Sequence, residues 1–368
     1  MNRFFRIYLL PGAVLQSVMI GGGYGTGREV VEFFSGYGMG GAVLAIATAA
    51  LSAAVVFAVS LEFARCFKAH DYRVFFKALL GRGWVIYELL AVALFVLVIA
   101  VLGAAAGEVL YGELGLAPWV GMVVVLVVVV VLNFYGRGVV TAVLAYWSVL
   151  LYAVFIAYFV LVLTTLYDAD VHRVDFSDVQ PGWWLSGIQY ACYNLTAVPV
   201  ILYAAYAIET RAQAVAAGAI GAVIAMLPAL FLHLSFVTEY PAILDAALPV
   251  YDVLGKLSIP MLTTFYLIVL FGTFIETGAG IIQGVIERLD GWWVERHGTP
   301  LTRLSHAVIA ATGVGLAGLL SSVGIVALIA EGYGTLAWGF LIVYIVPLLT
   351  VGVWRIHRHS GDSGERSG

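Results

Sequence analysis

Five ionisable side chains fall inside long apolar runs of this chain, where a charge is costly. Arg28, Glu29 and Glu32 follow a glycine-rich stretch, whereas Glu276 and Glu331 lie singly in two later runs. A charge at the centre of a bilayer costs at least ~2.5–3.5 kcal/mol, so such groups pair with one another, bind an ion or a proton, or line a water path. The chemistry that these residues predict is the binding of cations or protons within a membrane.

Each of these charges has more than one interpretation. Arg28 and Glu32 are four residues apart and can pair on one face of a helix. Alternatively, Arg28 forms an external gate with Glu331, which opens a later apolar run next to glycine. Glu276 fits a charged ligand of Na⁺, a protonatable group, or a neutral acid bonded to a backbone carbonyl. All of these hypotheses stay open at the level of sequence.

Two apolar runs are interrupted near their centres. MIGGGYGTGREVVEFF (Met19–Phe34) carries five glycines between Gly21 and Gly27, and each costs about 1 kcal/mol in a helix interior. In the later run YNLTAVP, Pro199 removes a backbone donor. Unwound backbone at membrane depth is tolerated only where it is buried in protein or lines a wet cavity. The pattern therefore predicts a binding site, although glycine packing contacts and a simple proline kink are the alternative.

The expected substrate site lies between these two interruptions. Its candidate residues come from both runs: Gly21, Gly22, Gly23, Tyr24, Gly25, Thr26, Tyr193, Asn194 and Thr196. We expect an anionic group of the substrate on the unwound Gly21–Thr26 segment, because a helix that restarts there presents free N–H groups. The break at Asn194–Ala197 offers carbonyls and polar side chains for an ammonium group.

The composition shows what kind of element must position these residues. Of the 368 residues, 62% are hydrophobic and only 11% are charged, too few charges for a soluble domain of this length. A span needs about 20 apolar residues, and ten segments qualify or nearly do. They are Ile7–Phe34, Gly40–Glu62, Trp84–Ala106, Pro118–Asn133, Val139–Leu166, Trp184–Ala207, Ala212–Val237, Ile259–Ile286, Leu304–Leu320 and Val323–Trp354.

The distribution of positive charge predicts the orientation of these spans. Of the 18 Lys and Arg residues, 15 fall at span ends that alternate to one side, while Arg173 and Lys256 fall on the other side and Arg28 lies within a span. The excess of positive charge marks the cytoplasmic side. We therefore expect both termini in the cytoplasm and the protein in the plasma membrane of a prokaryote.

Two halves of five spans follow from this count. Residues 1–166 form the first half, 167–182 an external loop, 183–356 the second half and 357–368 a disordered cytoplasmic tail. Because five is odd, the second half enters the membrane from the opposite side, so the two interrupted helices hold matching positions in inverted repeats. Two loops look structured: Arg73–Leu80 as an amphipathic helix on the cytoplasmic face, and Tyr240–Lys256 as an external loop with a short helix at ILDAAL.

The motifs also resemble a known family. GGGYGTGREVVEFF is similar to the G-A-G-F-x-x-G-[RQ]-E-[IV] signature of YkvI-like membrane proteins, and Phe274–Leu289 and Glu331–Leu349 resemble the eighth and tenth helices of that family. Through it the chain resembles the amino acid–polyamine–organocation superfamily, which implies an all-α, LeuT-like fold of ten helices in a 5+5 inverted repeat. In sodium-coupled members of this fold, a hydroxyl pair on the eighth helix and carbonyls of the first hold the ion. By that resemblance Glu276 and Thr277 match the hydroxyl pair, and Ser17 and Ile20 match the carbonyl donors.

Together these features predict a secondary transporter that uses alternating access. The expected substrate is a small polar metabolite, most readily an amino acid or a related carboxylate, bound at the midplane between the first, third, sixth and eighth helices. Coupling to Na⁺ or H⁺ is expected, with no other cofactor; the expected partners are a small-molecule substrate and the lipid bilayer, with no nucleic acid, and the sequence leaves the oligomeric state open. A ligand receptor on the same fold, or a passive facilitator, remains an alternative. No Ser-His-Asp set, HExxH motif or phosphate loop is present, so we expect no enzyme.

Overall fold

The computed structural model describes residues 3–135, 150, 153–166 and 174–365, and this part of the chain is entirely helical. Seven of its helices are long and apolar enough to cross a membrane, and two shorter apolar helices, Phe5–Met19 and Ala153–Thr165, accompany them. An apolar segment this long with few charges is stable only in lipid or in a large core. The chain is a multi-pass membrane protein.

The first half begins with an interrupted helix and continues with long ones. A short π-helical turn, Phe5–Leu9, leads into α1 (Leu10–Met19), α2 (Gly22–Thr26) and α3 (Arg28–Phe33). The following helices are α4 (Met39–Phe67), α5 (Tyr72–Leu80), α6 (Trp84–Leu114) and α7 (Pro118–Tyr135). The first part of the predicted fifth span, Val139–Leu166, lies outside the described residues, which include residue 150 and residues 153–166 of it.

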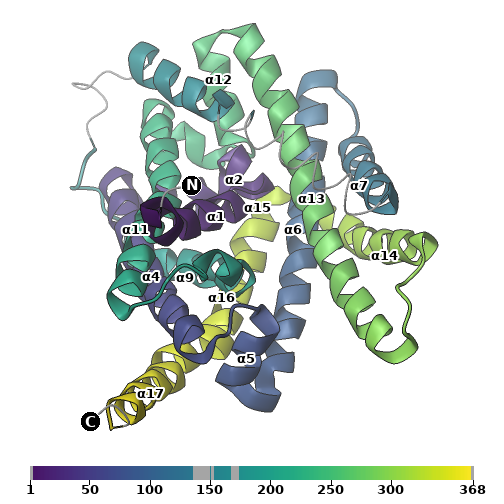
Figure 1. The fold of residues 1–368 in the computed structure, drawn as a ribbon. Coiled ribbons are helices and arrows are strands. Elements are labelled where there is room, and N and C mark those ends of the chain that lie inside the picture. Colours follow the sequence, from purple (N-terminus) through teal and green to yellow (C-terminus); the bar gives the residue numbers. More distant parts are fainter. Residues whose placement is uncertain (1–2, 136–149, 151–152, 167–173, 366–368) are drawn as a thin grey trace.

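The second half repeats this order. It begins with α9 (Trp183–Asn194), a 3₁₀ turn (Leu195–Ala197), α10 (Val198–Ile201) and a further 3₁₀ turn (Leu202–Ala205). It continues with α11 (Arg211–Phe236), α12 (Pro249–Leu257), α13 (Pro260–His297) and α14 (Arg303–Ser321). In Figure 1, α6 and α13 run the height of the molecule, with α12 near one end and α5 and α17 at the other.

The predicted tenth span is one helix with several changes of hydrogen-bonding register. It consists of α15 (Ile325–Ala327), a π-helical segment (Leu328–Tyr333), α16 (Gly334–Phe340), two further π-helical segments (Leu341–Ile345 and Leu348–Gly352) and α17 (Val353–Glu365). Each π-helical turn accommodates an extra residue and so rotates the residues that follow. This rotation decides which side chains of the tenth span point inward.

Glycine contacts pack α1, α4 and α11 into one body. A Cβ built on Gly12 of α1 would lie 2.5 Å from the Cα of Gly221 in α11, and one on Gly218 would lie 2.5 Å from the backbone N of Ala58 in α4. Backbones that approach this closely gain dispersion contacts that larger residues would prevent, which is how helices associate in lipid without a hydrophobic driving force.

One of the two structured segments agrees with the prediction and the other differs. The helix α5 is amphipathic as predicted, with Phe75 and Phe76 buried and Lys77 exposed, and the carboxylate of Asp71 caps it by accepting hydrogen bonds from the N–H groups of Arg73 and Val74. In the loop before α12, ILDAAL forms only a 3₁₀ turn over Ala242–Asp245, and the helix is the next segment, α12. Proline is favoured in the first turn of a helix, which places this start at Pro249.

Residues 357–365 of the segment predicted to be a disordered tail are helical, since α17 continues to Glu365, and residues 366–368 lie outside the described residues. Once a helix is nucleated, each added residue gains a hydrogen bond for one more fixed pair of dihedrals, so a helix that leaves the membrane continues into polar sequence.

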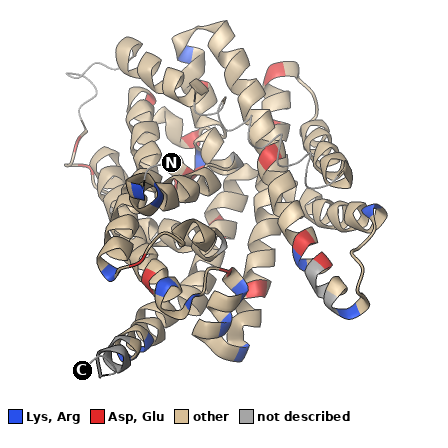
Figure 2. Cartoon of the chain, in the orientation of Figure 1, with Lys and Arg blue, Asp and Glu red and all other residues tan. Residues whose placement is uncertain are grey.

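The charges are distributed unevenly along the height of the molecule. Figure 2 shows most Lys and Arg residues in the half that carries α5 and α17. This half holds the ion pairs of Arg65 with Glu62, at 2.7 Å, and of Arg288 with Glu88, at 2.9 Å.

Candidate functional site

The first membrane helix is broken at two glycines with different backbone geometry. Ile20 ends α1 at ψ 74°, and Gly21 follows in an extended conformation with φ −98° and ψ −169°. After the single turn of α2, Gly27 adopts φ 84° and ψ −7°, a left-handed conformation that residues with a Cβ rarely adopt. The glycine cluster therefore yields two sharp changes of direction separated by one helical turn.

Side chains from other positions hold the carbonyls that this break exposes. The hydroxyl of Tyr266, on α13, donates a 2.9 Å hydrogen bond to the carbonyl of Gly25, and the hydroxyl of Thr26 donates a 2.8 Å bond to the carbonyl of Gly23. Both Tyr266 and Thr26 are fully buried. Buried carbonyls without partners would cost free energy, so these hydroxyls stabilise the broken helix.

The sixth membrane helix is interrupted much more gently. Between α9 and α10 the residues that flank Leu195–Ala197 keep right-handed helical dihedrals, such as φ −69° and ψ −37° at Asn194 and φ −70° and ψ −25° at Ala197. Only the hydrogen-bonding pattern tightens from α to 3₁₀. Pro199, which lacks an N–H group, explains this change because it leaves the carbonyl four residues earlier without its usual donor.

The polar groups of the sixth helix are satisfied close by. The hydroxyl of Tyr87, on α6, donates a 3.0 Å hydrogen bond to the carbonyl of Thr196. The amide of Asn194 donates to the carbonyl of Tyr190, and the hydroxyl of Thr196 donates to that of Tyr193. We predicted that Asn194 and Thr196 face a substrate ammonium group, but in this structure both side chains bond to their own helix.

The central charge of the site is Glu29. Its side chain is buried, with the residue only 5% exposed, and its Oε2 accepts a 2.6 Å hydrogen bond from the hydroxyl of Tyr193. Its Oε1 occupies the space beside Gly23, where an added Cβ would lie 2.3 Å from that oxygen. The sequence marked Glu29 as a charge within a span but assigned it no role. The turn at Gly27 directs its side chain back onto the glycine break.

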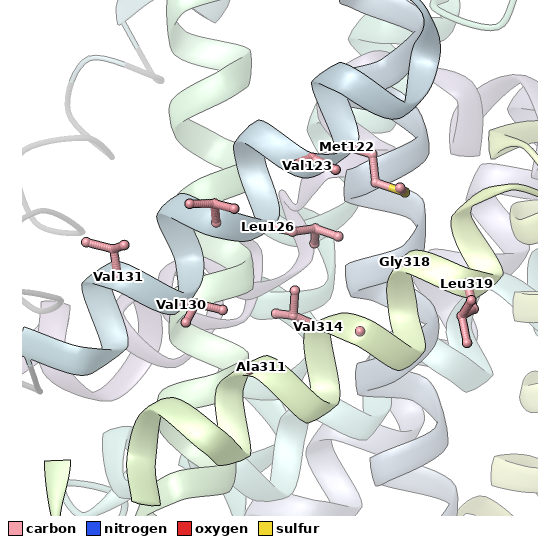
Figure 3. A pocket seen from close by; sticks show the side chains of 11 residues that line it. Met122, Val123, Leu126, Val130, Val131, Ala311, Val314, Gly318 and Leu319 are labelled. Carbon is pink, nitrogen blue, oxygen red and sulfur yellow. The ribbon is translucent and has the colours of Figure 1, made fainter. Parts of the chain in front are cut away.

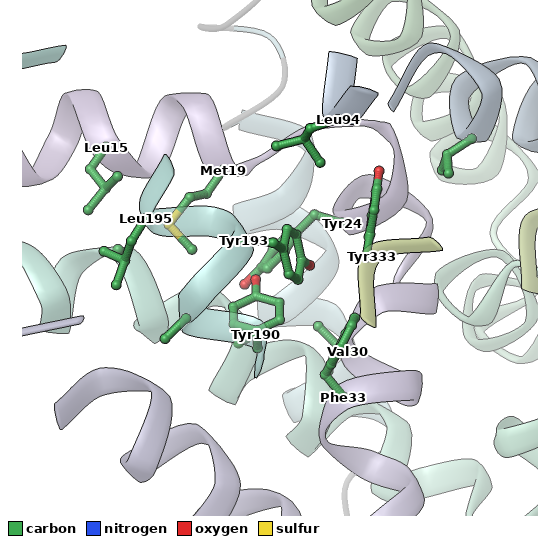
Figure 4. Close-up of a cluster of buried hydrophobic side chains, with 14 of the residues drawn as sticks. Leu15, Met19, Tyr24, Val30, Phe33, Leu94, Tyr190, Tyr193, Leu195 and Tyr333 are labelled. Carbon is green, nitrogen blue, oxygen red and sulfur yellow. The ribbon is translucent and has the colours of Figure 1, made fainter. Parts of the chain in front are cut away.

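Four tyrosines lie near this carboxylate, and Figure 4 shows their rings gathered in the buried core. Tyr24 comes from the break itself, Tyr190 and Tyr193 from α9, and Tyr333 from the tenth span. The rings of Tyr193 and Tyr333 stack with centroids 4.8 Å apart, and those of Tyr190 and Tyr193 meet edge to face at 5.5 Å. The buried hydroxyls of Tyr24 and Tyr190 have no hydrogen-bond partner among the described residues.

Tyr24 and Tyr193 were candidate site residues, and the structure brings them together around Glu29. Tyr190 and Tyr333 were not among the candidates. Tyr190 lies one turn before Tyr193 on the same helix, a spacing that places both on one face, so periodicity alone would have pointed to it. No comparable signal in the sequence connects Tyr333 to the first helix.

The residues predicted to bind a coupling ion are only partly brought together. Thr277 of α13 lies beside the break, because a Cβ on Gly21 would be 3.9 Å from its Oγ1. Ser17 is exposed, and its hydroxyl donates to the carbonyl of Val14, while Ile20 caps the end of α1. Glu276 is half-buried and is engaged in an interaction of its own.

Arg28 makes different contacts from those of the predicted gate. Its guanidinium donates to Glu32 at 2.9 Å and to the carbonyls of Leu244 and Ala246 at 2.7 and 3.0 Å. It thereby ties α3, the last part of the first helix, to the loop before α12. Glu331 is exposed instead, since the π-helical segment Leu328–Tyr333 turns Tyr333 inward and leaves Glu331 on the outer face.

A groove elsewhere on the protein is lined by apolar side chains and glycine. It runs between α7 and α14 (Figure 3), and its lining includes Met122, Leu126, Val130 and Val314. An apolar face of this kind on a membrane protein is suited to acyl chains. The polar site therefore lies in the packed interior around Glu29.

Comparisons with known proteins agree with this architecture. No family model matches the chain, and no curated protein matches it. Among solved structures it resembles the inward-facing form of Mhp1, with a TM-score of 0.58 and 17% identity over 91% of this chain and 76% of that one. MhsT in complex with L-phenylalanine gives 0.57 and 14% over 97% and 98%. A manganese transporter of Eremococcus coleocola gives 0.56 and 15% over 94% and 78%.

The chain has the LeuT fold. The all-helical structure and the interrupted first and sixth helices confirm the predicted fold class, whereas the resemblance to YkvI-like proteins stays a prediction.

Proposed function

We propose that this protein is a secondary active transporter that works by alternating access. One observation carries the proposal: the third and eighth membrane helices each donate a tyrosine hydroxyl to the backbone of a broken helix, Tyr87 to Thr196 and Tyr266 to Gly25. The third and eighth helices thus each hold one of the two interruptions, and the buried Glu29 carboxylate lies beside the first of them. In transporters of this architecture the substrate site lies at such interruptions, near the middle of the membrane.

The proposed substrate is a small polar metabolite, an amino acid or a related carboxylate, and the proposed coupling ion is H⁺ or Na⁺. Tyrosine faces attract an ammonium group and also pack against an apolar side chain, which together suit an amino acid. The structurally similar MhsT binds L-phenylalanine, which supports this class. The predicted position of the anionic group, on the Gly21–Thr26 segment, adjoins the Glu29 carboxyl group, so an anion there would be repelled by an ionised Glu29 and not by a protonated one.

We also propose the orientation expected from the positive charges, with both termini in the cytoplasm. The clustering of basic residues around α5 and α17 supports it (Figure 2), because an excess of Lys and Arg marks the cytoplasmic side.

Transport by purified protein in sealed liposomes tests the proposal. Labelled amino acids are presented with an inward gradient of H⁺ or of Na⁺, and the same vesicles are measured after an ionophore collapses the gradient. Accumulation above the external concentration that disappears with the gradient is the expected result. Saturable binding without flux would instead indicate a receptor, and flux that only equilibrates would indicate a passive facilitator.

A further inference from the structure

Among the described residues, no opposite charge pairs with Glu29, although an arginine precedes it in the sequence. The guanidinium of Arg28 points away, towards Glu32 and the carbonyls of Leu244 and Ala246. Among the described residues, the one hydrogen bond of the Glu29 side chain comes from the Tyr193 hydroxyl. An ionised carboxylate that is buried without a cation is strongly disfavoured. In this packed arrangement Glu29 needs either a proton or a bound cation.

The groups that face Glu29 are all tyrosines. Tyr24, Tyr190, Tyr193 and Tyr333 each lie close enough to interact with its charge. They come from three of the described elements that pack against α3: the break, α9 and the tenth span. A phenol can donate a hydrogen bond to a carboxylate or accept one from a carboxylic acid. These phenols can therefore form a hydrogen bond with Glu29 in either of its protonation states, and they supply no fixed positive charge.

The other titratable groups on the neighbouring elements point elsewhere. His233 of α11 binds the Ser35 hydroxyl at 2.9 Å and the carbonyl of Met39 at 3.0 Å. Asp245 in the external loop, Asp252 of α12 and Glu331 of the tenth span are exposed. None of these contacts involves the Glu29 carboxylate, so the state of Glu29 depends on the tyrosines and on access of water.

Space and hydrogen bonding favour a proton over a larger cation. Glu29 fills the room left by Gly23, and the stacked rings of Tyr193 and Tyr333 close the other side. The buried hydroxyls of Tyr24 and Tyr190 lack partners among the described residues. A protonated Glu29 keeps the hydrogen bond from Tyr193 on Oε2 and gains an O–H on Oε1, which can be donated to a phenol oxygen beside it.

We propose that Glu29 is the proton-binding site of this protein. It is protonated when Tyr24, Tyr190, Tyr193 and Tyr333, which we call the tyrosine cage, are closed around it, and it is deprotonated when this cage opens to water. On opening, the O–H bond of Glu29 breaks, the proton passes to water and the carboxylate is left hydrated. On closing, the carboxylate takes up a proton from the aqueous solution before the tyrosines exclude water from the site. That this cycle drives substrate movement rests on the proposed function, whereas the proton site itself does not.

Infrared difference spectroscopy of the purified, lipid-reconstituted protein tests the proton site without a substrate. A protonated carboxyl group shows a C=O stretch that is separate from the amide bands and shifts in D₂O. We expect this band in the unmodified protein and its loss, with its pH dependence, in Glu29→Gln. The matched control is Glu32→Gln, which should keep the band because Glu32 is ion-paired with Arg28.

Two further variants keep the test decisive. Tyr193→Phe removes the hydrogen bond to Oε2 but retains the acid, so the band should shift in frequency and remain; this variant serves even if Glu29→Gln folds poorly. Glu276→Gln should leave the band in place. Loss of the band in Glu276→Gln but not in Glu29→Gln would overturn the assignment. So would a Glu29 that stays ionised at every pH and responds to added Na⁺ or ammonium instead.

Coupling is measured separately, in liposomes that contain a pH-sensitive dye. Addition of a transported amino acid should acidify the interior in the unmodified protein and not in Glu29→Gln. A normal infrared band together with amino acid uptake that carries no protons would refute the coupling role, while an absence of any uptake would count against the proposed function and leave the proton site standing.

Discussion

The first and the sixth membrane helices are both interrupted, but one is broken by glycine and the other by proline, and the two breaks differ in kind. At Gly21 and Gly27 the chain leaves helical geometry altogether, with extended and left-handed conformations. Around Leu195–Ala197 the dihedral angles remain right-handed and only the hydrogen-bonding register changes. Glycine permits new directions of the backbone, whereas proline removes a donor and in this helix leaves the neighbouring dihedrals right-handed.

This difference assigns separate tasks to the two helices. The glycine break turns Glu29 back onto its own backbone and frees the Gly25 carbonyl for Tyr266. The proline break keeps α9 aligned, so that Tyr190 and Tyr193 present their rings to the same place. The first helix contributes Glu29 and the two backbone turns at Gly21 and Gly27, and the sixth contributes the aromatic rings that pack beside the carboxylate.

If the two breaks differ in this way, Gly27→Ala should cause the largest loss of stability. Alanine at φ 84° costs about 1–2 kcal/mol, and its Cβ would lie 2.5 Å from Phe236 Cζ and 3.0 Å from Val250 Cγ2, which adds about 1–3 kcal/mol of overpacking. We expect a large fall in the thermal unfolding temperature. The control Gly334→Ala, in a helix and with nothing within 4 Å, should be neutral or stabilising, and equal effects of the two variants would contradict the strained turn.

Gly23→Ala should have the next largest effect, and chiefly on function. Its Cβ would lie 2.3 Å from Glu29 Oε1, so the carboxylate must leave its position and lose its bond to Tyr193. We expect a folded protein, destabilised by about 1–3 kcal/mol, with amino acid uptake abolished. Gly112→Ala, which meets nothing within 4 Å, is the control. Gly40 would be a poor one, because an added Cβ would lie 2.6 Å from Phe176 Cδ1. Normal uptake by Gly23→Ala would mean that Glu29 has no part in the site.

A smaller difference should separate Tyr266→Phe from Tyr87→Phe. Each variant leaves a buried carbonyl without its side-chain donor, which costs about 1–3 kcal/mol. The cost should be higher for Tyr266→Phe, because the left-handed turn at Gly27 directs the following N–H groups away from the carbonyl of Gly25. The helical residues after Thr196 can replace Tyr87 more easily. Thermal unfolding of both variants measures the difference, and a reversed order would argue against it.

The smallest effect should come from Pro199→Ala. Because the sixth helix already has right-handed dihedrals there, alanine needs no change of direction and restores one N–H donor. We expect a change in stability below about 1 kcal/mol and retention of uptake. A loss of uptake comparable to that of Gly23→Ala would show that the sixth helix must also unwind, and the contrast between the two breaks would fail.

The sequence predicted what depends on local signals. Runs of apolar residues predicted the spans, and the glycines between Gly21 and Gly27 predicted the break, because both effects arise within a few residues. The position of α12 was missed, although Pro249 is a local signal for a helix start.

The rest depends on rotations that accumulate along the backbone. The left-handed turn at Gly27 directs Glu29 inward and Arg28 towards the loop before α12. From the sequence we expected a role for Arg28 and assigned none to Glu29. A π-helical segment turns Tyr333 inward and Glu331 outward. Neither rotation can be read from residue spacing, since each shifts the periodicity on which spacing arguments rest.

The helix α13 is so long that a small tilt at one end displaces its other end by several ångströms. Its 38 residues correspond to ~57 Å at 1.5 Å per residue, almost twice the ~30 Å of hydrocarbon that it crosses. Tyr266 attaches one end to the glycine break, and Arg288, 22 residues further along, attaches the other to Glu88. Those 22 residues span ~33 Å, so a tilt of about 10° at Tyr266 would carry Arg288 through roughly 6 Å. A displacement too small to disturb the tyrosines would then be enough to part an ion pair at the far end.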